Sequence, residues 1–193
     1  SNNKLICFSL VNGEKIWEFN SDNDFIKSQK KLSIVYDNKQ IYFNNSRGDI
    51  YALDKENGNL VWLSPTREDS ESFKSFMLKT SKLVLDQNNL FFSNNKDTFF
   101  SLDKNTGVIE WTQNINSDLR PVVVENIIFT ISLDGYLFII EKKTGNIIRI
   151  TDIFKDTKVR RTKNISMSGF VVSSNKIYLS MNNGKIMQIE ISN

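Results

Sequence analysis

The sequence predicts an all-β fold, namely a β-propeller built from four-stranded antiparallel blades. One pattern recurs along the chain, as GDIYALDKENGNLVW from Gly48 to Trp62 and as KDTFFSLDKNTGVIEW from Lys96 to Trp111. Each copy holds two short strand-like runs separated by a polar turn that ends in glycine, and two further strand-like runs precede it. Self-similarity at this spacing is typical of repeat architectures, and four antiparallel strands per repeat form the blade of a propeller.

Three more copies extend the pattern over nearly the whole chain. DGYLFIIEKKTGNIIR covers Asp134–Arg149, NKLICFSLVNGEKIW ends at Trp17, and NGKIMQIEIS covers Asn183–Ser192. We therefore read residues 1–193 as a single propeller segment. Its predicted parts are a partial blade at 1–19, complete blades near 31–63, 80–113 and 120–150, and an incomplete last blade at 168–193.

The two upstream strands of each blade are read from short apolar runs that alternate with polar residues. These runs are Leu32–Tyr36 and Gln40–Phe43, Lys82–Leu85 and Leu90–Ser93, Pro121–Val124 and Ile127–Ile131, and Phe170–Val172 and Lys176–Ser180. On this count the chain begins and ends at the third strand of a blade. Because a propeller removes exposed edges by closing its ring, we expect a fragment of about four blades.

The hairpin turns of the repeat are predicted from their glycines. A loop of this length uses a type I turn followed by a left-handed residue, and glycine enters that region at low cost. The glycines concerned are Gly13, Gly58, Gly107 and Gly145. Asp54 and Asp103 precede two of the turns, where a carboxylate can accept backbone N–H bonds. We assign both aspartates this structural role rather than a catalytic one.

Composition excludes several functional classes. The chain has no histidine, which removes the commonest general base and metal ligand, and its single cysteine, Cys7, allows no intrachain disulfide. The formal net charge of +3 is too small to indicate nucleic-acid binding. No apolar run reaches the roughly 20 residues that span a bilayer. We expect no catalytic residue, no metal and no cofactor.

The hairpin pattern G-x-[LI]-[YF]-A-[LI]-D-x-x-[TN]-G-x-[LIV]-x-W resembles that of the pyrroloquinoline-quinone-like repeat family. Within that family, the stretches Leu83–Gln113, Asp134–Gly145 and Asn183–Ser192 are most similar to the C-terminal half of the propeller lipoproteins of the outer-membrane β-barrel assembly machinery. The resemblance implies a non-catalytic scaffold with an eight-bladed ring. It also implies a periplasmic location at the inner face of the outer membrane, with a lipid anchor N-terminal to this chain as the only membrane attachment.

The resemblance also implies roles for the repeated aromatic residues. Trp17, Trp62 and Trp111 would dock between neighbouring blades, which suits the large apolar area of an indole ring. Arg149 replaces the tryptophan in the fourth copy, so we expect a weaker or different contact there.

Function is expected in the loops between blades, because loops on a rigid scaffold carry recognition. The four loops are Asn20–Lys30, Ser64–Lys79, Asn114–Arg120 and Thr151–Ser166. Aromatic and apolar residues beside charges are typical of protein-binding surfaces. The candidate partner-binding residues are Phe25, Ile26, Arg67, Phe73, Phe76, Arg160 and Arg161. The alternative is that the apolar residues of these loops pack under a neighbouring blade.

Three functions stay open at this point. The first, implied by the resemblance, is a scaffold that binds the periplasmic domains of the barrel-inserting subunit. The second is a fragment of a quinone-dependent dehydrogenase, and the third is another binding module on the same repeats. The vicinal cysteine pair and haem motif of such dehydrogenases are excluded by one cysteine and no histidine. Open edges further suggest a homodimer, or pairing with a missing half, through Lys4–Leu10 and Lys185–Ile191.

Overall fold

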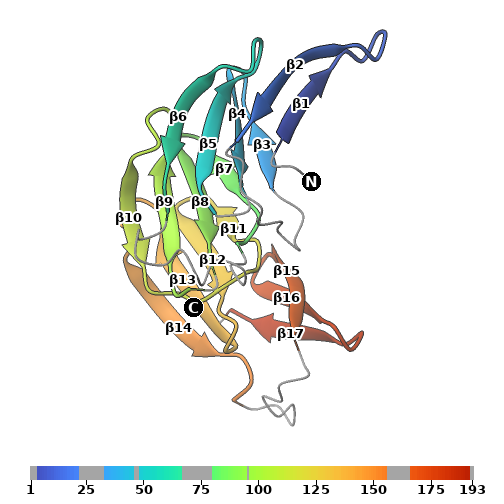
Figure 1. Ribbon diagram of the computed structural model, residues 1–193. Coiled ribbons are helices and arrows are strands. Elements are labelled where there is room, and N and C mark those ends of the chain that lie inside the picture. The colour runs from blue at the N-terminus through green and yellow to red at the C-terminus, as the bar shows by residue number, and fades with distance from the viewer. Residues whose placement is uncertain are drawn as a thin grey trace.

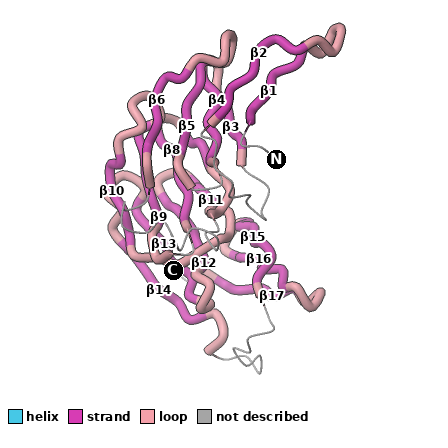
Figure 2. The backbone as a smooth tube through the Cα atoms, in the orientation of Figure 1, coloured by secondary structure: helices cyan, strands magenta, loops and turns pink. Residues whose placement is uncertain are grey.

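The computed structural model describes residues 4–21, 33–45, 48–66, 80–94, 96–155 and 166–191. These residues form strands β1 to β17 and no helix, so the all-β prediction is confirmed for the described part of the chain. All strands pair antiparallel within five sheets, which follow one another around an arc (Figure 1). We number these sheets blades 1 to 5 in chain order. Strands and tight turns make up almost all of the described backbone (Figure 2).

The first sheet has two strands, the next three sheets have four each, and the last has three. Blade 1 holds β1 (Lys4–Phe8) and β2 (Lys15–Asn20). Blade 2 holds β3 (Ile34–Tyr36), β4 (Gln40–Asn44), β5 (Ile50–Asp54) and β6 (Leu60–Ser64). Blade 3 holds β7 (Val84–Asp86), β8 (Asn89–Ser93), β9 (Phe99–Asp103) and β10 (Ile109–Gln113). Blade 4 holds β11 (Val122–Val124), β12 (Ile127–Ile131), β13 (Tyr136–Glu141) and β14 (Ile147–Asp152). Blade 5 holds β15 (Met167–Ser173), β16 (Lys176–Met181) and β17 (Ile186–Glu190).

The third strand of each complete blade is buried more fully than its alternating pattern suggests. In β5, for example, Ile50, Tyr51, Ala52 and Leu53 are all buried. The reason is that a blade packs against a neighbour on each of its two faces. Ile50 and Ala52 belong to a cluster with blade 3, whereas Tyr51 and Leu53 pack towards blade 1. A polar residue in a third strand therefore does not indicate that this face of the strand is exposed to solvent.

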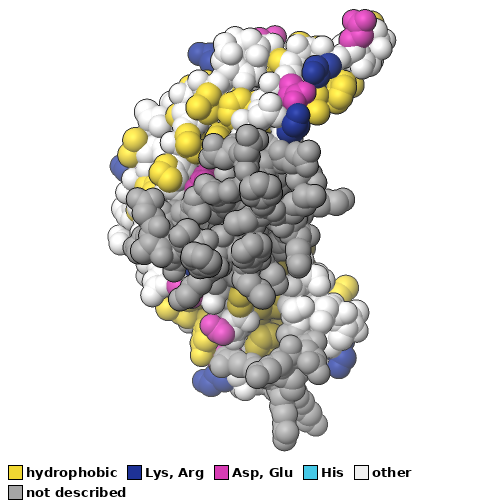
Figure 3. Space-filling model, in the orientation of Figure 1, with side chains coloured by type: hydrophobic (Ala, Val, Ile, Leu, Met, Phe, Trp, Pro, Cys, Tyr) yellow, Lys and Arg dark blue, Asp and Glu magenta, His cyan; other side chains and the backbone are white. Residues whose placement is uncertain are grey.

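The core is a series of layers between blades rather than one central cluster. Tyr42 and Trp62 of blade 2 pack with Leu90 and Phe92 of blade 3. Leu137 of blade 4 packs in the same way with residues of blade 5. The outermost strands carry exposed apolar side chains instead, including Leu60, Val61 and Leu63 on β6 and Ile147, Ile148 and Ile150 on β14. Apolar patches are accordingly spaced along this outer rim (Figure 3).

Candidate functional site

One contact, repeated between successive blades, uses the tryptophan of the outermost strand. Trp17 on β2, Trp62 on β6 and Trp111 on β10 each lie against a glycine in the third hairpin turn of the following blade. A Cβ atom at Gly58 would lie 2.6 Å from the Trp17 ring, and one at Gly107 would lie 2.5 Å from the Trp62 ring. Gly145 stands in the same relation to Trp111. The turn and the indole therefore fit together only when the turn residue has no side chain.

The indole N–H of each tryptophan is satisfied by the same carbonyl of that turn. The donor–acceptor distances are 3.1 Å from Trp17 to Lys55, 2.9 Å from Trp62 to Lys104 and 3.1 Å from Trp111 to Lys142. Trp17 and Trp62 are buried, each 9% exposed, whereas Trp111 is only partly buried. The tryptophan ring and its hydrogen bond together fix the distance between neighbouring blades.

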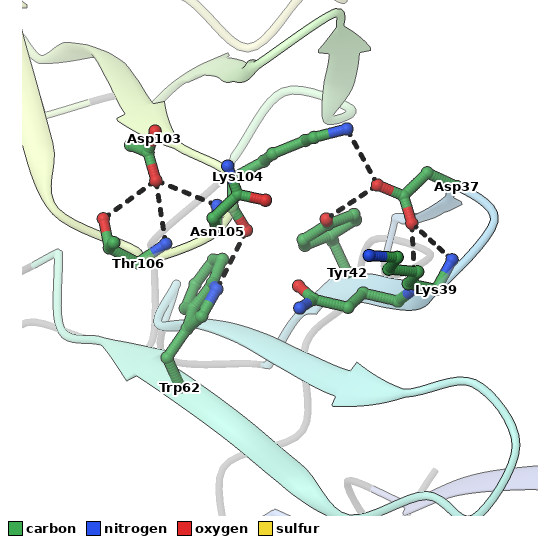
Figure 4. A network of polar contacts seen from close by, with 9 residues as sticks. Asp37, Lys39, Tyr42, Trp62, Asp103, Lys104, Asn105 and Thr106 are labelled. Carbon is green, nitrogen blue, oxygen red and sulfur yellow. Dashed lines mark hydrogen bonds and ion pairs between the residues drawn. The ribbon is translucent and has the colours of Figure 1, made fainter.

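The lysine whose carbonyl accepts this bond also forms an ion pair with the preceding blade. Lys104 Nζ lies 2.9 Å from Asp37 Oδ2, in the first turn of blade 2 (Figure 4). Tyr42 donates to the same Asp37 oxygen at 3.1 Å. The other Asp37 oxygen accepts the backbone N–H groups of Lys39 and Gln40, both at 2.8 Å.

This network changes the proton affinity of two groups. Partial burial by itself raises the pKa of Asp37. The bonds from Lys39, Lys104, Gln40 and Tyr42 outweigh this effect and hold that pKa well below its ordinary value. Burial, reinforced by the Asp37 charge, raises the pKa of the Tyr42 hydroxyl well above its ordinary value. Asp37 is thus an anion, and Tyr42 a neutral donor, at neutral pH.

Between blades 3 and 4 the ion pair recurs, with Lys142 Nζ 2.7 Å from Asp86 Oδ2. Between blades 4 and 5 both partners change. Val124 takes the position of Asp37 and Asp86, because each of the three lies at the end of a first strand or directly after it and pairs with the residue three positions on, across the first turn. Ile191 takes the position of the lysines, because its backbone N–H likewise donates to the first turn of its own blade. At these three junctions, from blade 2 to blade 5, the lysine and the acid are therefore either both present or both absent.

Arg149 stands where the tryptophan would be in blade 4. It pairs with Ile139 across β13 and β14, as Trp62 pairs with Ala52 across β5 and β6. The junction of blades 4 and 5 therefore lacks both the indole and the ion pair.

The two aspartates singled out in the sequence lie at the third turn of their blades. Asp54 Oδ1 accepts the backbone N–H groups of Glu56 at 2.9 Å and Asn57 at 3.1 Å. Asp103 Oδ1 accepts those of Asn105 at 2.9 Å and Thr106 at 2.8 Å. Both carboxylates are thus engaged in shaping a turn, which is a structural role.

All seven candidate partner-binding residues lie outside the described part of the chain. They are Phe25, Ile26, Arg67, Phe73, Phe76, Arg160 and Arg161. Their role as contact residues stays a prediction.

The described inter-blade loop, Asn114–Arg120, is more buried than its polar sequence suggests. Ile115, Ser117 and Leu119 point into the molecule and are nearly inaccessible. Ser117 Oγ donates to Ile131 O at 2.6 Å, and Ser117 N donates to Asn94 O at 3.2 Å. This loop therefore ties blade 3 to blade 4, as expected for a loop packed under its neighbours.

A cavity of about 500 Å³ opens beside this loop, where the first strands of blades 3, 4 and 5 begin. Leu119, Met167 and Phe170 supply its apolar wall, and Lys82 and Arg120 bring two cationic side chains to it. Asp118 also lines it. An apolar pocket beside cationic groups suits an apolar side chain flanked by an acidic one.

Four charged residues that join the blades were not predicted from the sequence, namely Asp37, Asp86, Lys104 and Lys142. A signal was available, because lysine follows the acidic residue in three of the third turns, at Lys55, Lys104 and Lys142. The acidic partner of each lysine could not be recognised, because it belongs to the preceding blade and lies in a first turn whose sequence does not repeat from blade to blade.

Within the described ranges, no group of three or more Cys, Asp or Glu side chains could hold a metal ion. Nor does that part of the chain contain a helix long and apolar enough to cross a bilayer.

The repeat, the blades and their junctions agree with a comparison to known families. Residues 1–151 match the family model described as outer membrane protein assembly factor BamB. The chain belongs to the BamB family. No curated protein matches it in sequence.

Solved structures confirm the fold of this BamB-family chain. The crystal structure of BamB from Moraxella catarrhalis matches with a TM-score of 0.69 and 15% identity, over 98% of this chain and 52% of that one. The computationally designed Ika8 protein matches with a TM-score of 0.69 and 13% identity, over 98% of this chain and 53% of that one. The designed Ika4 protein matches with a TM-score of 0.62 and 13% identity, over 89% of this chain and 100% of that one. The chain thus spans about half the length of BamB and Ika8, as a segment of a β-propeller.

Proposed function

We propose that this chain is a non-catalytic protein-binding scaffold that takes part in the assembly of outer-membrane β-barrel proteins. The match of residues 1–151 to the BamB family carries the proposal. The junctions described above make the segment a rigid platform, and loops on a rigid platform are suited to recognition. Its partner would be the barrel-inserting subunit, held by its periplasmic domains. The location would be the periplasm, at the inner face of the outer membrane.

The cavity beside Asn114–Arg120 supports a binding role for the loop end of the blades. It lies at the end where each fourth strand passes to the next blade, which is the end of the predicted partner-binding loops. Its apolar wall and its two cations, Lys82 and Arg120, favour a partner segment with an apolar residue next to a carboxylate. We propose that Phe25, Ile26, Arg67, Phe73, Phe76, Arg160 and Arg161 extend this contact surface.

A binding measurement with the purified periplasmic domains of the barrel-inserting subunit tests the proposal. The double substitution Lys82→Glu and Arg120→Glu should weaken binding about tenfold or more, because it places like charges opposite the acidic partner. Lys143→Glu is the matched control, since Lys143 lies in the third turn at the opposite end of blade 4 and should leave binding unchanged. No binding by the unchanged protein would refute the scaffold. Equal binding by the double variant and the unchanged protein would show that the cavity is not part of the interface.

The same protein should bind neither pyrroloquinoline quinone nor calcium. Titration calorimetry with each ligand checks this, and a micromolar affinity for the quinone would favour the dehydrogenase instead.

A further inference from the structure

Two clefts open at the turn end of the blades, opposite the cavity described above. The smaller, of about 370 Å³, lies between blades 2 and 3, and the larger, of about 750 Å³, lies between blades 3 and 4. Both volumes are within the range of small-ligand sites. Asn88, in the first turn of blade 3, lines both clefts. The two clefts are therefore neighbours along the arc, and one chain-like ligand can enter both.

The two clefts repeat the same construction at successive junctions. Each is lined by the first turn of one blade, by the first turn of the next and by the third turn of that next blade. Lys104 lines the smaller cleft, with its charge paired to Asp37. Lys142 lines the larger one, with its charge paired to Asp86. Figure 4 shows Lys104, Asp37 and Asn105, which line the smaller cleft. A repeated site of this kind suits a ligand that is itself built from repeated units.

Carboxamide side chains without an internal partner line both clefts. They belong to Asn38, Gln87, Asn88, Asn105 and Asn126. All five residues are exposed, and none of their carboxamides forms a hydrogen bond with another described residue. A carboxamide offers two N–H donors and a carbonyl acceptor, and a hydroxyl group is likewise a donor and an acceptor at once. The free carboxamides therefore match a ligand that is rich in hydroxyl groups.

Charge and apolar area disfavour two other classes of ligand. The charges of Lys104 and Lys142 are already neutralised by their aspartates, so neither cleft gathers the positive charge that a polyanion requires. Among the described residues that line the clefts, Trp111 is the one with an apolar side chain. Its ring already stacks on Phe99 and packs against Gly145, so it supplies little apolar area to the larger cleft. The lining thus favours an uncharged, hydroxyl-rich ligand over a nucleic acid or an apolar peptide.

We propose that these two clefts together bind an uncharged oligosaccharide. In the smaller cleft, sugar hydroxyl groups form hydrogen bonds with Asn38 and Asn105. In the larger cleft, they form hydrogen bonds with Gln87 and Asn126. Asn88 lies between the two clefts and contacts the sugar chain in both. The site is at the opposite end of the blades from the cavity and the inter-blade loops, so sugar binding is independent of the proposed protein-binding function.

Nuclear magnetic resonance titration of isotope-labelled protein tests the proposal, because carboxamide and indole N–H signals report directly on the clefts. The probes are cellotetraose, maltotetraose and the tetramer of N-acetylglucosamine. At least one should shift the side-chain signals of Asn88 and Asn126 and the indole signal of Trp111. The indole signal of Trp17, which lines neither cleft, should stay unchanged. That tetramer should bind at least about tenfold more tightly than its monosaccharide, because only the longer ligand occupies both clefts.

Asn88→Ala should weaken binding of that tetramer about tenfold, because hydrogen bonds are lost in both clefts. The substitution keeps the backbone carbonyl of residue 88, which accepts the Lys104 N–H at 2.8 Å, so the junction stays intact. Asn126→Ala should weaken binding less, since it affects the larger cleft alone, and an equal loss would overturn the two-cleft site.

Asn175→Ala is the matched control, because Asn175 has the same position in blade 5 and lines neither cleft. It should bind the tetramer as the unchanged protein does. Three results would refute the proposal. None of the three tetramers shifts the cleft signals, Asn88→Ala binds as tightly as the unchanged protein, or Asn175→Ala binds as weakly as Asn88→Ala.

Discussion

At the scale of single residues, a few turn positions decide how one blade meets the next. Gly58, Gly107 and Gly145 have positive φ, and each also accepts an indole ring where a Cβ atom would be. Gly13 has the same conformation with φ 74°, but no atom lies within 4 Å of its Cβ position. Gly13 is therefore an internal control, which separates the cost of a side chain at positive φ from the cost of its overlap with an indole ring.

Alanine at these glycines should reveal both costs. Gly13→Ala should lower the free energy of unfolding by about 1–2 kcal/mol, the cost of a left-handed residue with a side chain. Gly58→Ala should cost about 1–3 kcal/mol more, because the new methyl group overlaps the Trp17 ring. Denaturant unfolding of both variants checks this. Equal losses would show that the indole contact adds nothing to stability.

Asp37 should make stability depend on pH. Its folded pKa is below its unfolded value, so its contribution is full above the unfolded pKa of about 3.9. That contribution is lost as the pH falls towards the folded pKa. Asp37→Asn should therefore cost about 1.5–3 kcal/mol at pH 7, through weaker bonds to Lys104 and the turn, and clearly less at pH 3. Unfolding of both proteins across this range checks it, and a difference independent of pH would contradict the ion-pair assignment.

At the scale of elements, the strand pattern was largely predictable. The prediction of Ile127–Ile131 coincides with β12, and that of Gln40–Phe43 falls one residue short of β4. Strands can be identified from alternating apolar residues and from turn glycines, because both signals depend only on residues that are close together in the sequence. Burial of both faces of β5 and the Lys–Asp pairs could not be predicted, because they depend on the neighbouring blade. The burial of Ile115 and Leu119 could not be predicted from the sequence for the same reason.

The docking of an outermost strand should be measurable by truncating its tryptophan. Trp62→Ala should lower the free energy of unfolding by about 3–5 kcal/mol, as for other large-to-small changes at buried positions. Trp62 packs with Tyr42 and donates to Lys104 O at 2.9 Å, so both a cavity and an unpaired carbonyl result. Arg149→Ala, at the same position of β14, is the matched control and should have a much smaller effect. A loss below about 1 kcal/mol for Trp62→Ala would refute the docking role.

At the scale of the whole molecule, the arc exposes a free strand edge at each end, on β1 and on β17. The interior junctions repeat the same few contacts, which makes the middle of the arc uniform. The terminal blades differ because each has one side without a partner among the described strands. Exposed edges and an open apolar face favour association, and a two-fold pair is the commonest arrangement.

Residues 1–193 on their own should therefore form a dimer through β1 and β17, at the segments Lys4–Leu10 and Lys185–Ile191. Light scattering at micromolar concentration should give about twice the 22.3 kDa mass of one chain, decreasing on dilution. A monomeric chain whose β1 and β17 amides resist hydrogen exchange would mean that the two ends cover each other within one molecule.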